Sequence, residues 1–117
     1  MITAYTDGAC KGNGKDDGGR GGFGAYIEFS DGTTLSVWGG EDNTTNNRME
    51  LLGAITALEK TPNDVPLTLY TDSSYVQKGI TEWIGSWKQR RWKQVKNVDL
   101  WQKLDSLSQN RTINWQW

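Results

Sequence analysis

The alternation of apolar and polar positions in the first third of the chain predicts β structure. Residues 1–7 form an apolar-rich run typical of a strand, and a glycine-rich loop is predicted over residues 8–22. Residues 23–29 and 33–39 flank the turn sequence Ser-Asp-Gly, which predicts an antiparallel hairpin. We therefore expect the chain to begin with a strand and a hairpin before its first helix.

The middle of the chain has the spacing of an amphipathic helix. Within residues 41–60, a polar loop leads into a segment whose apolar residues recur every three to four positions. A neighbouring row contains small residues, which predicts that the helix packs closely on another element. Two prolines follow and end the helix. The apolar face is Leu51, Ala54, Ile55 and Leu58, the neighbouring row is Glu50, Gly53 and Ala57, and the prolines are Pro62 and Pro66.

The second half of the chain alternates between strand and helix patterns. A buried-looking strand is predicted over residues 67–71, a short helix over 72–80 and a second helical segment over 81–92. A further helix over 97–107 and a last strand over 112–117 complete the chain. This order fits a hairpin sheet extended by parallel strands through right-handed crossovers. The expected fold is a single α/β domain over residues 1–117.

Composition narrows the function classes. The chain has 117 residues and a net charge of -1, and it contains no apolar run of membrane-spanning length. Its N-terminus lacks the pattern of a signal peptide, and its one cysteine excludes an intrachain disulfide, so we expect a cytoplasmic protein. The chain has no histidine, which removes the commonest general base and metal ligand.

The sequence Tyr-Thr-Asp closes two of the predicted strands, at Asp7 and at Asp72. If these strands are parallel neighbours in matched register, the two carboxylates lie side by side at the sheet edge that binds ligands. Carboxylates that close repel one another unless a cation lies between them, and Mg²⁺ or Mn²⁺ suits oxygen ligands. Glu50, near the start of the long helix, is the third candidate. The alternative is that either Asp forms a turn or caps a helix.

Residues 87–96, with the sequence WKQRRWKQVK, concentrate lysine and arginine and contain no acid. Such a local basic cluster indicates a docking surface for a polyanion, even though the net charge of the whole chain is slightly negative. The alternative is a solvated helix face whose tryptophans lie in the core. For the charged residues we favour binding, and for the tryptophans we favour packing.

These motifs resemble type 1 ribonuclease H in family order over essentially the whole chain. The matching segments are YTDGACKGNG, GGFGAYIEF, TTNNRMELLGAITALE, LYTDSSYVQKGITEWI and VKNVDLW. The resemblance implies a ribonuclease H-like α/β fold: a five-stranded mixed sheet, its first three strands antiparallel, flanked by helices. It also implies an endonuclease that hydrolyses the RNA strand of RNA/DNA hybrids to 5′-phosphate and 3′-hydroxyl ends by a two-metal mechanism. Mg²⁺ is the expected cofactor, with Mn²⁺ as the alternative.

The resemblance also assigns roles to individual residues. Asp7, Glu50 and Asp72 become the catalytic and metal-binding carboxylates. For Asn46 the alternative is helix capping, and for Cys10 we favour an inert small residue. The implied substrate contacts are Cys10, Asn13, Thr45, Asn46, Arg48, Trp87, Lys88, Arg90, Arg91 and Lys93.

The family normally continues past the fifth strand to a histidine and a fourth acidic residue, and no residue here is assigned to either. The alternative function is therefore a catalytically weak or inactive module that binds RNA/DNA hybrid, or a fragment completed by another chain. The presence of all three carboxylates favours the enzyme, because clustered acids without metal repel a phosphate backbone. We expect a monomer, with association through the strand near Trp115 and Trp117 as the alternative.

Overall fold

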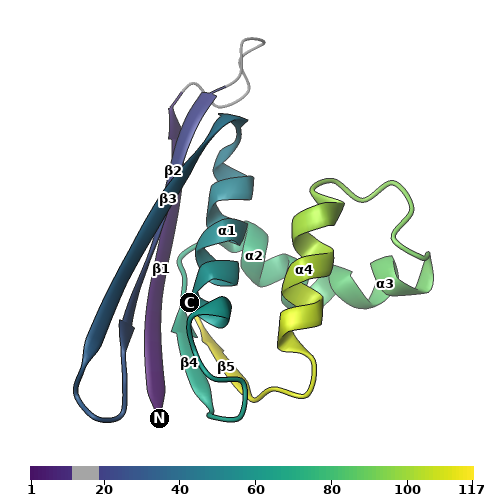
Figure 1. The fold of residues 1–117 in the computed structure, drawn as a ribbon. Coiled ribbons are helices and arrows are strands. Elements are labelled where there is room, and N and C mark those ends of the chain that lie inside the picture. The colour runs from purple at the N-terminus through teal and green to yellow at the C-terminus, as the bar shows by residue number, and fades with distance from the viewer. Residues whose placement is uncertain (12–18) are drawn as a thin grey trace.

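The computed structural model describes residues 1–11 and 19–117, which contain a five-stranded sheet in the order β3-β2-β1-β4-β5 (Figure 1). The β1–β2 and β2–β3 pairs are antiparallel, whereas the β1–β4 and β4–β5 pairs are parallel. This confirms the mixed sheet and its antiparallel first three strands. The strands are β1 (Ile2–Lys11), β2 (Gly19–Glu28), β3 (Thr34–Thr44), β4 (Leu67–Tyr70) and β5 (Ile113–Gln116).

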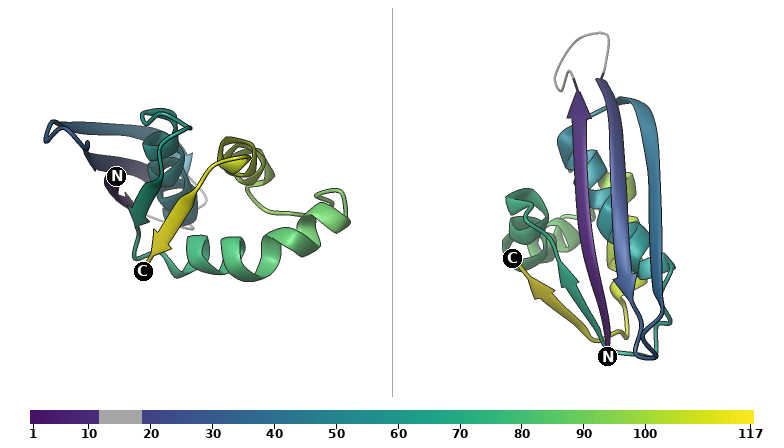
Figure 2. Two further views of the ribbon diagram at one scale, coloured as in Figure 1. Left: turned by 90° about the horizontal axis from the view of Figure 1, so that it is seen from below. Right: turned by 90° about the vertical axis from the view of Figure 1, so that its left-hand side faces the viewer.

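All helices of the described residues lie on one face of this sheet (Figures 1 and 2). The right-hand view of Figure 2 looks onto the other face, where β1, β2 and β3 have no helix in front of them. No helix in the ranges that the structure describes is long and apolar enough to cross a membrane. The helices are α1 (Asn46–Glu59), α2 (Ser74–Lys78), the π-helical turn η1 (Gly79–Trp83), α3 (Ile84–Gln89) and α4 (Val98–Ser108).

The first three strands are longer than the hydrophobic pattern predicts. The predicted loop over 8–22 is wrong at both ends, because β1 continues to Lys11 and β2 begins at Gly19. Glycines have low strand propensity, but a Cβ at Gly21 would lie 2.5 Å from Cγ of Met49. The glycine is therefore needed where the start of α1 lies against the hairpin, and this requirement cannot be seen from local propensity.

The two helical segments predicted over 72–80 and 81–92 form one run, α2–η1–α3. The π turn begins at Gly79, where a Cβ would lie only 2.0 Å from the ring of the fully buried Trp101. The position of the irregular turn is therefore explained by long-range packing against this ring, and not by any break in the local sequence pattern. The helix predicted over 97–107 is confirmed as α4, which spans Val98–Ser108, and of the two starting residues considered, Asn97 and Asp99, Asn97 is the N-cap.

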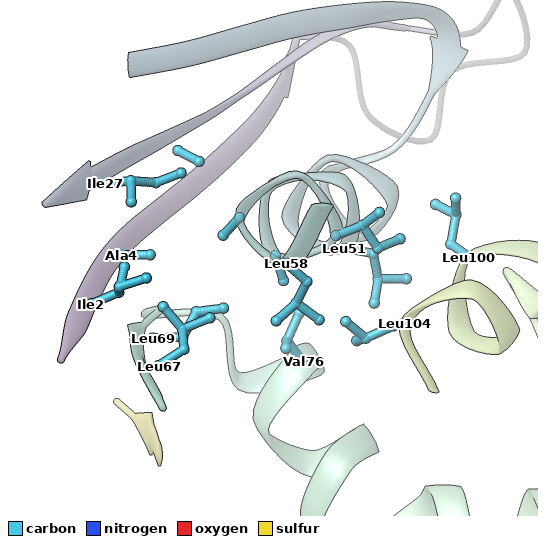
Figure 3. Packing of buried hydrophobic residues seen from close by; sticks show 14 of the residues in the cluster. Ile2, Ala4, Ile27, Leu51, Leu58, Leu67, Leu69, Val76, Leu100 and Leu104 are labelled. Atoms are coloured by element: carbon cyan, nitrogen blue, oxygen red, sulfur yellow. The ribbon is translucent and has the colours of Figure 1, made fainter. Parts of the chain in front are cut away.

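The hydrophobic core lies between the sheet and α1 and continues from α1 to α4 (Figure 3). Ile2, Ala4 and Ile27 face α1 from the sheet, and Leu51 and Leu104 meet between α1 and α4. The predicted apolar face of α1 is confirmed, because all four of its residues are at most 2% exposed. This core fixes α1 on β1, and the candidate functional site described below lies beside the N-terminal end of α1.

Candidate active site

The register between β1 and β4 aligns the two repeated Tyr-Thr-Asp sequences. Tyr5 pairs with Tyr70, and their rings stack with centroids 5.0 Å apart. Continued by two residues, the same register places Asp72 level with Asp7. Only β4 ends there, because Asp7 is still paired with Gly24 of β2. The matched register is thus confirmed, while the expectation that both strands end at the acids is wrong for β1.

Glu50 reaches the same place because α1 lies directly on the backbone of β1. A Cβ at Gly8 would be 2.4 Å from the carbonyl carbon of Met49 and 2.6 Å from the nitrogen of Glu50. A Cβ at Gly53 would be 3.2 Å from the carbonyl oxygen of Asp7. Both glycines allow a close approach that a larger residue would prevent, as the row of small residues in α1 predicts.

The three predicted carboxylates converge. One oxygen each from Asp7, Glu50 and Asp72 lies within 4.8 Å of the others. Asp7 and Asp72 are exposed, whereas Glu50 is half-buried, and its Oε2 is buried with no hydrogen-bond partner among the described residues. Leaving a buried carboxylate oxygen without a partner costs free energy. The described residues place no positively charged or hydrogen-bond-donating group against this oxygen.

The electrostatics of Glu50 support the same conclusion. Burial, and then the charges of Asp7 and Asp72, raise the pKa of Glu50 to about 7, while the backbone N–H of Gly8 partly opposes the rise. A divalent cation would offset both causes, because it compensates the lost solvation of the unpartnered oxygen and neutralises the repulsion between the carboxylates. The donor set is carboxylate oxygen only, which suits Mg²⁺ or Mn²⁺ better than soft metals. The residues therefore fit the metal that the family implies.

The alternative roles for the two aspartates are not found in the structure. Asp7 lies inside β1 rather than in a turn. The N-cap of α2 is Ser73, whose Oγ accepts a hydrogen bond from the backbone N–H of Val76 at 3.1 Å. Asp72 is therefore not needed to begin the helix, and its carboxylate is available at the site.

The N-terminus of α1 is held by residues predicted to contact substrate. Thr45 is the N-cap and accepts a hydrogen bond from the backbone N–H of Arg48 at 3.2 Å, so the capping role considered for Asn46 belongs to Thr45. Asn46 Oδ1 accepts from the backbone N–H of Cys10, whose Sγ contacts the carbonyl oxygen of Thr44 at 3.2 Å. These contacts join α1 to β1 beside the carboxylates. Asn13 lies outside the described residues.

The basic cluster of residues 87–96 begins in the last turn of α3 and continues almost to the start of α4. Arg90, Arg91 and Lys93 are exposed and line a surface hollow, and Lys88 forms an ion pair with Asp105 at 3.1 Å. Trp87 instead packs against the core, with its ring centroid 5.0 Å from that of Trp101. The charges are thus presented to solvent while the tryptophan is used for packing.

Arg48 has partners that the sequence analysis did not find. Its Nε donates to Glu41 at 3.1 Å, and its Nη1 and Nη2 donate to the two oxygens of Asp99 at 3.1 and 3.0 Å. Two carboxylates therefore already satisfy this guanidinium. The only sequence signal was the motif VKNVDLW, which contains Asp99, and nothing local to Arg48 indicates that the two meet.

Three convergent carboxylates beside the end of a parallel strand define an oxygen-only site of the class that binds hard divalent cations. Comparison with known proteins gives the family. The RNase H family model matches residues 1–117. The chain therefore belongs to the ribonuclease H family, as its motifs predict.

Individual relatives agree with the type 1 assignment. The chain is 53% identical to Ribonuclease H of Methylobacillus flagellatus, over all of this chain and 78% of that protein. It is 50% identical to Ribonuclease HI of Pseudomonas aeruginosa, over all of this chain and 79% of the relative. The crystal structure of LC9-RNase H1, described as a type 1 RNase H with the type 2 active-site motif, superposes with a TM-score of 0.84 at 32% identity. That match covers 99% of this chain and 61% of the other, and it confirms the ribonuclease H-like fold.

Proposed function

We propose that this chain hydrolyses the RNA strand of RNA/DNA hybrids and that Asp7, Glu50 and Asp72 perform the reaction with bound divalent cations. The observation that carries the proposal is the convergence of three carboxylates around a buried Glu50 oxygen that has no partner. Relatives about half identical over the full chain, named Ribonuclease H and Ribonuclease HI, support the reaction and the substrate. The expected products carry 5′-phosphate and 3′-hydroxyl ends.

The three side chains have different tasks in this proposal. Glu50 would hold a cation from the half-buried side, while Asp7 and Asp72 would present their oxygens on the exposed side, where a phosphate can approach. When bound, divalent cations supply charge neutralisation at the scissile phosphate and acidify the attacking water. We propose Mg²⁺ as the cofactor, with Mn²⁺ as the alternative that the assay below separates.

The basic segment supplies the second part of the proposed interface. Arg90, Arg91 and Lys93 have exposed charges with no acid in the same segment, so they suit the phosphates of one strand of the hybrid. Closer to the carboxylates, Cys10, Thr45 and Asn46 surround the start of α1, and the hybrid would pass over this end of the helix. The proposed path runs from the basic segment to the carboxylates.

The experiment is cleavage of an end-labelled RNA/DNA hybrid in Mg²⁺, in Mn²⁺ and in EDTA, with RNA/RNA and DNA/DNA duplexes as controls. We expect metal-dependent cleavage of the hybrid alone. Asp7→Asn should reduce the rate to background while the melting temperature stays close to wild type. The matched control is Asp64→Asn, an exposed acid in the loop before β4 for which the structure shows no ion pair, and it should cleave normally.

A full rate in Asp7→Asn would refute the assignment of the site. Hybrid binding without cleavage in wild type would instead support the binding module as the function. We further propose that the chain forms one domain, acts as a monomer and works in the cytoplasm, proposals supported by the continuous core and by the single cysteine.

A further inference from the structure

The side chain of Arg48 is the centre of a polar network between α1, α4 and the end of β3. Its side chain is only 24% exposed, and its guanidinium contacts Glu41 and both oxygens of Asp99. A two-pronged arginine–carboxylate contact fixes both distance and orientation, unlike a contact through a point charge. Arg48 therefore sets how the first turn of α4 lies against the start of α1.

The network extends beyond this ion pair. Arg48 Nη1 lies 3.4 Å from Asn97 Oδ1, and Asn97 Nδ2 donates to the hydroxyl of Tyr75 at 3.1 Å. Trp101 Nε1 donates to the same hydroxyl at 2.9 Å. Asn97 has a left-handed backbone with φ of 57° and makes no side-chain capping contact, so its amide serves this network instead. The network thus joins α1, α2 and α4.

These contacts have a functional location. Arg48 lies two residues before the carboxylate of Glu50 in the same helix. Asp99 lies in the first turn of α4, three residues after the end of the basic segment at Lys96. Lys88 joins α3 to α4 through its ion pair with Asp105. Because the basic segment contacts α4 through Lys88 and leads into α4 at its other end, the placement of α4 on α1 contributes to the distance between the basic segment and the carboxylates.

We propose that Arg48 is a positioning residue that holds the basic segment in register with the carboxylate site, rather than a ligand of the substrate backbone. This inference rests on the proposed function, since it concerns the distance between the basic segment and the carboxylates, which are the two ends of the proposed substrate path. Apolar contacts of Leu100 and Leu104 hold α4 against α1, but such contacts are not directional. The Arg48–Asp99 pair adds a directional contact at the end of α4 that lies beside the carboxylate site.

Replacing Asp99 distinguishes a phosphate-binding Arg48 from a positioning Arg48, because the two roles predict opposite effects on the handling of the hybrid. If Arg48 were a phosphate ligand, Asp99→Asn would release its guanidinium and strengthen hybrid binding. If Arg48 positions α4, Asp99→Asn should impair cleavage in the same way as Arg48→Met. Arg48→Lys is the third variant. A lysine would partly replace a phosphate ligand, but it cannot form the two-pronged contact, so we expect it to behave like Arg48→Met.

For Asp99→Asn, Arg48→Met and Arg48→Lys we expect kcat to fall about tenfold with KM almost unchanged, because misplacement by about 1 Å is enough for such a loss. Cleavage of a hybrid with one fixed blunt end should also spread to neighbouring positions. The matched control is Lys103→Met, which breaks the Lys103–Glu59 ion pair between the same two helices farther from the site. It should leave the rate and the cleavage positions unchanged. All assays are run well below the measured melting temperature of each variant.

Tighter hybrid binding by Asp99→Asn, or wild-type cleavage positions in Arg48→Met, would overturn the proposal. A second readout is hybrid binding measured by fluorescence anisotropy over a series of salt concentrations. A lost phosphate contact lowers the salt slope by about one, whereas a positioning residue leaves it unchanged. This readout needs no cleavage, so a wild-type chain that binds without cutting would contradict the proposed function and still test the role of Arg48.

Discussion

The fold raises the pKa of the half-buried Glu50 carboxyl group from 4.5 to about 7. A carboxyl group with a raised pKa in the folded state binds its proton more tightly there than in the unfolded chain. Its contribution to stability is therefore present below pH 4.5 and is lost as the pH rises through about 7. Without metal, the folded protein should lose stability over this range because Glu50 must ionise beside Asp7 and Asp72.

We predict that Glu50→Gln stabilises the metal-free protein at pH 8, by on the order of 1 kcal/mol after allowance for solvent screening. The variant should show a smaller gain at pH 5, where wild-type Glu50 is largely protonated. Thermal unfolding in EDTA at both values measures this. Mg²⁺ should stabilise wild type at pH 8 more than it stabilises Glu50→Gln. A variant that melts below wild type at pH 8 in EDTA would contradict the prediction.

Gly8 is the second residue whose identity the site requires. We predict that Gly8→Ala lowers stability by about 1–3 kcal/mol, because its Cβ would overlap backbone atoms of Met49 and push α1 away from β1. Cleavage should fall as well, since Glu50 moves with the helix. Unfolding in urea and hybrid cleavage give the two readouts. Gly22→Ala is the control, because its Cβ would meet nothing closer than 3.6 Å, and it should retain the cleavage rate.

At the scale of the element, the basic segment of residues 87–96, which begins in α3, makes a testable contribution to binding. We predict that Arg90→Gln with Arg91→Gln raises KM and lowers the salt slope of hybrid binding by about two, one for each lost phosphate contact. The value of kcat should change little, because the carboxylates are untouched. Anisotropy titrations at several salt concentrations measure the slope.

The control for the basic segment is Lys60→Gln with Lys78→Gln, which removes two exposed charges outside residues 87–96. An equal loss of salt dependence in the control would show that net charge, rather than this segment, governs binding. Arg91 has a left-handed backbone, with φ of 57°, within the hollow that the segment lines. The arrangement of these charges is therefore set by backbone conformation as well as by composition.

At the scale of the whole molecule, the sheet face without helices carries exposed aromatic rings. On that face Tyr5 stacks on Tyr70 and lies 6.3 Å from Tyr26 between ring centroids. At the sheet edge Trp115 of β5, which packs partly against the core, stacks on Trp117 at 6.0 Å. Because these rings already cover one another within the chain, we predict a monomer at micromolar concentration. Sedimentation velocity over a hundredfold range of concentration measures this.

A concentration-dependent dimer would contradict the monomer prediction, and two variants would then locate its interface. Trp117→Ser would disrupt association through β5, whereas Tyr26→Ser would disrupt association through the uncovered face. Trp38, which is 77% exposed on that face, gives an intrinsic fluorescence signal for contacts there. Neither variant changes a residue proposed to contact metal or substrate.

The amino-acid sequence alone determined the order and type of the main elements and the identity of the three carboxylates. It could do so because helical spacing in α1, the Ser-Asp-Gly turn and the repeated Tyr-Thr-Asp sequence are local features. The repeat also led us to consider a matched register of β1 and β4, which the structure confirms, and such a register is set by which side chains each strand buries. The family was likewise predicted from contiguous motifs.

Only the tertiary structure decided the features that depend on residues far apart in the chain. The glycine-rich ends of β1 and β2 became strand because α1 packs against them, and the π turn at Gly79 faces the ring of Trp101. Arg48 carried the signature of a substrate contact, but its guanidinium is satisfied by Glu41 and Asp99. The physical reason is the same in each case: a close contact between distant segments overrides what the neighbouring residues in the sequence favour.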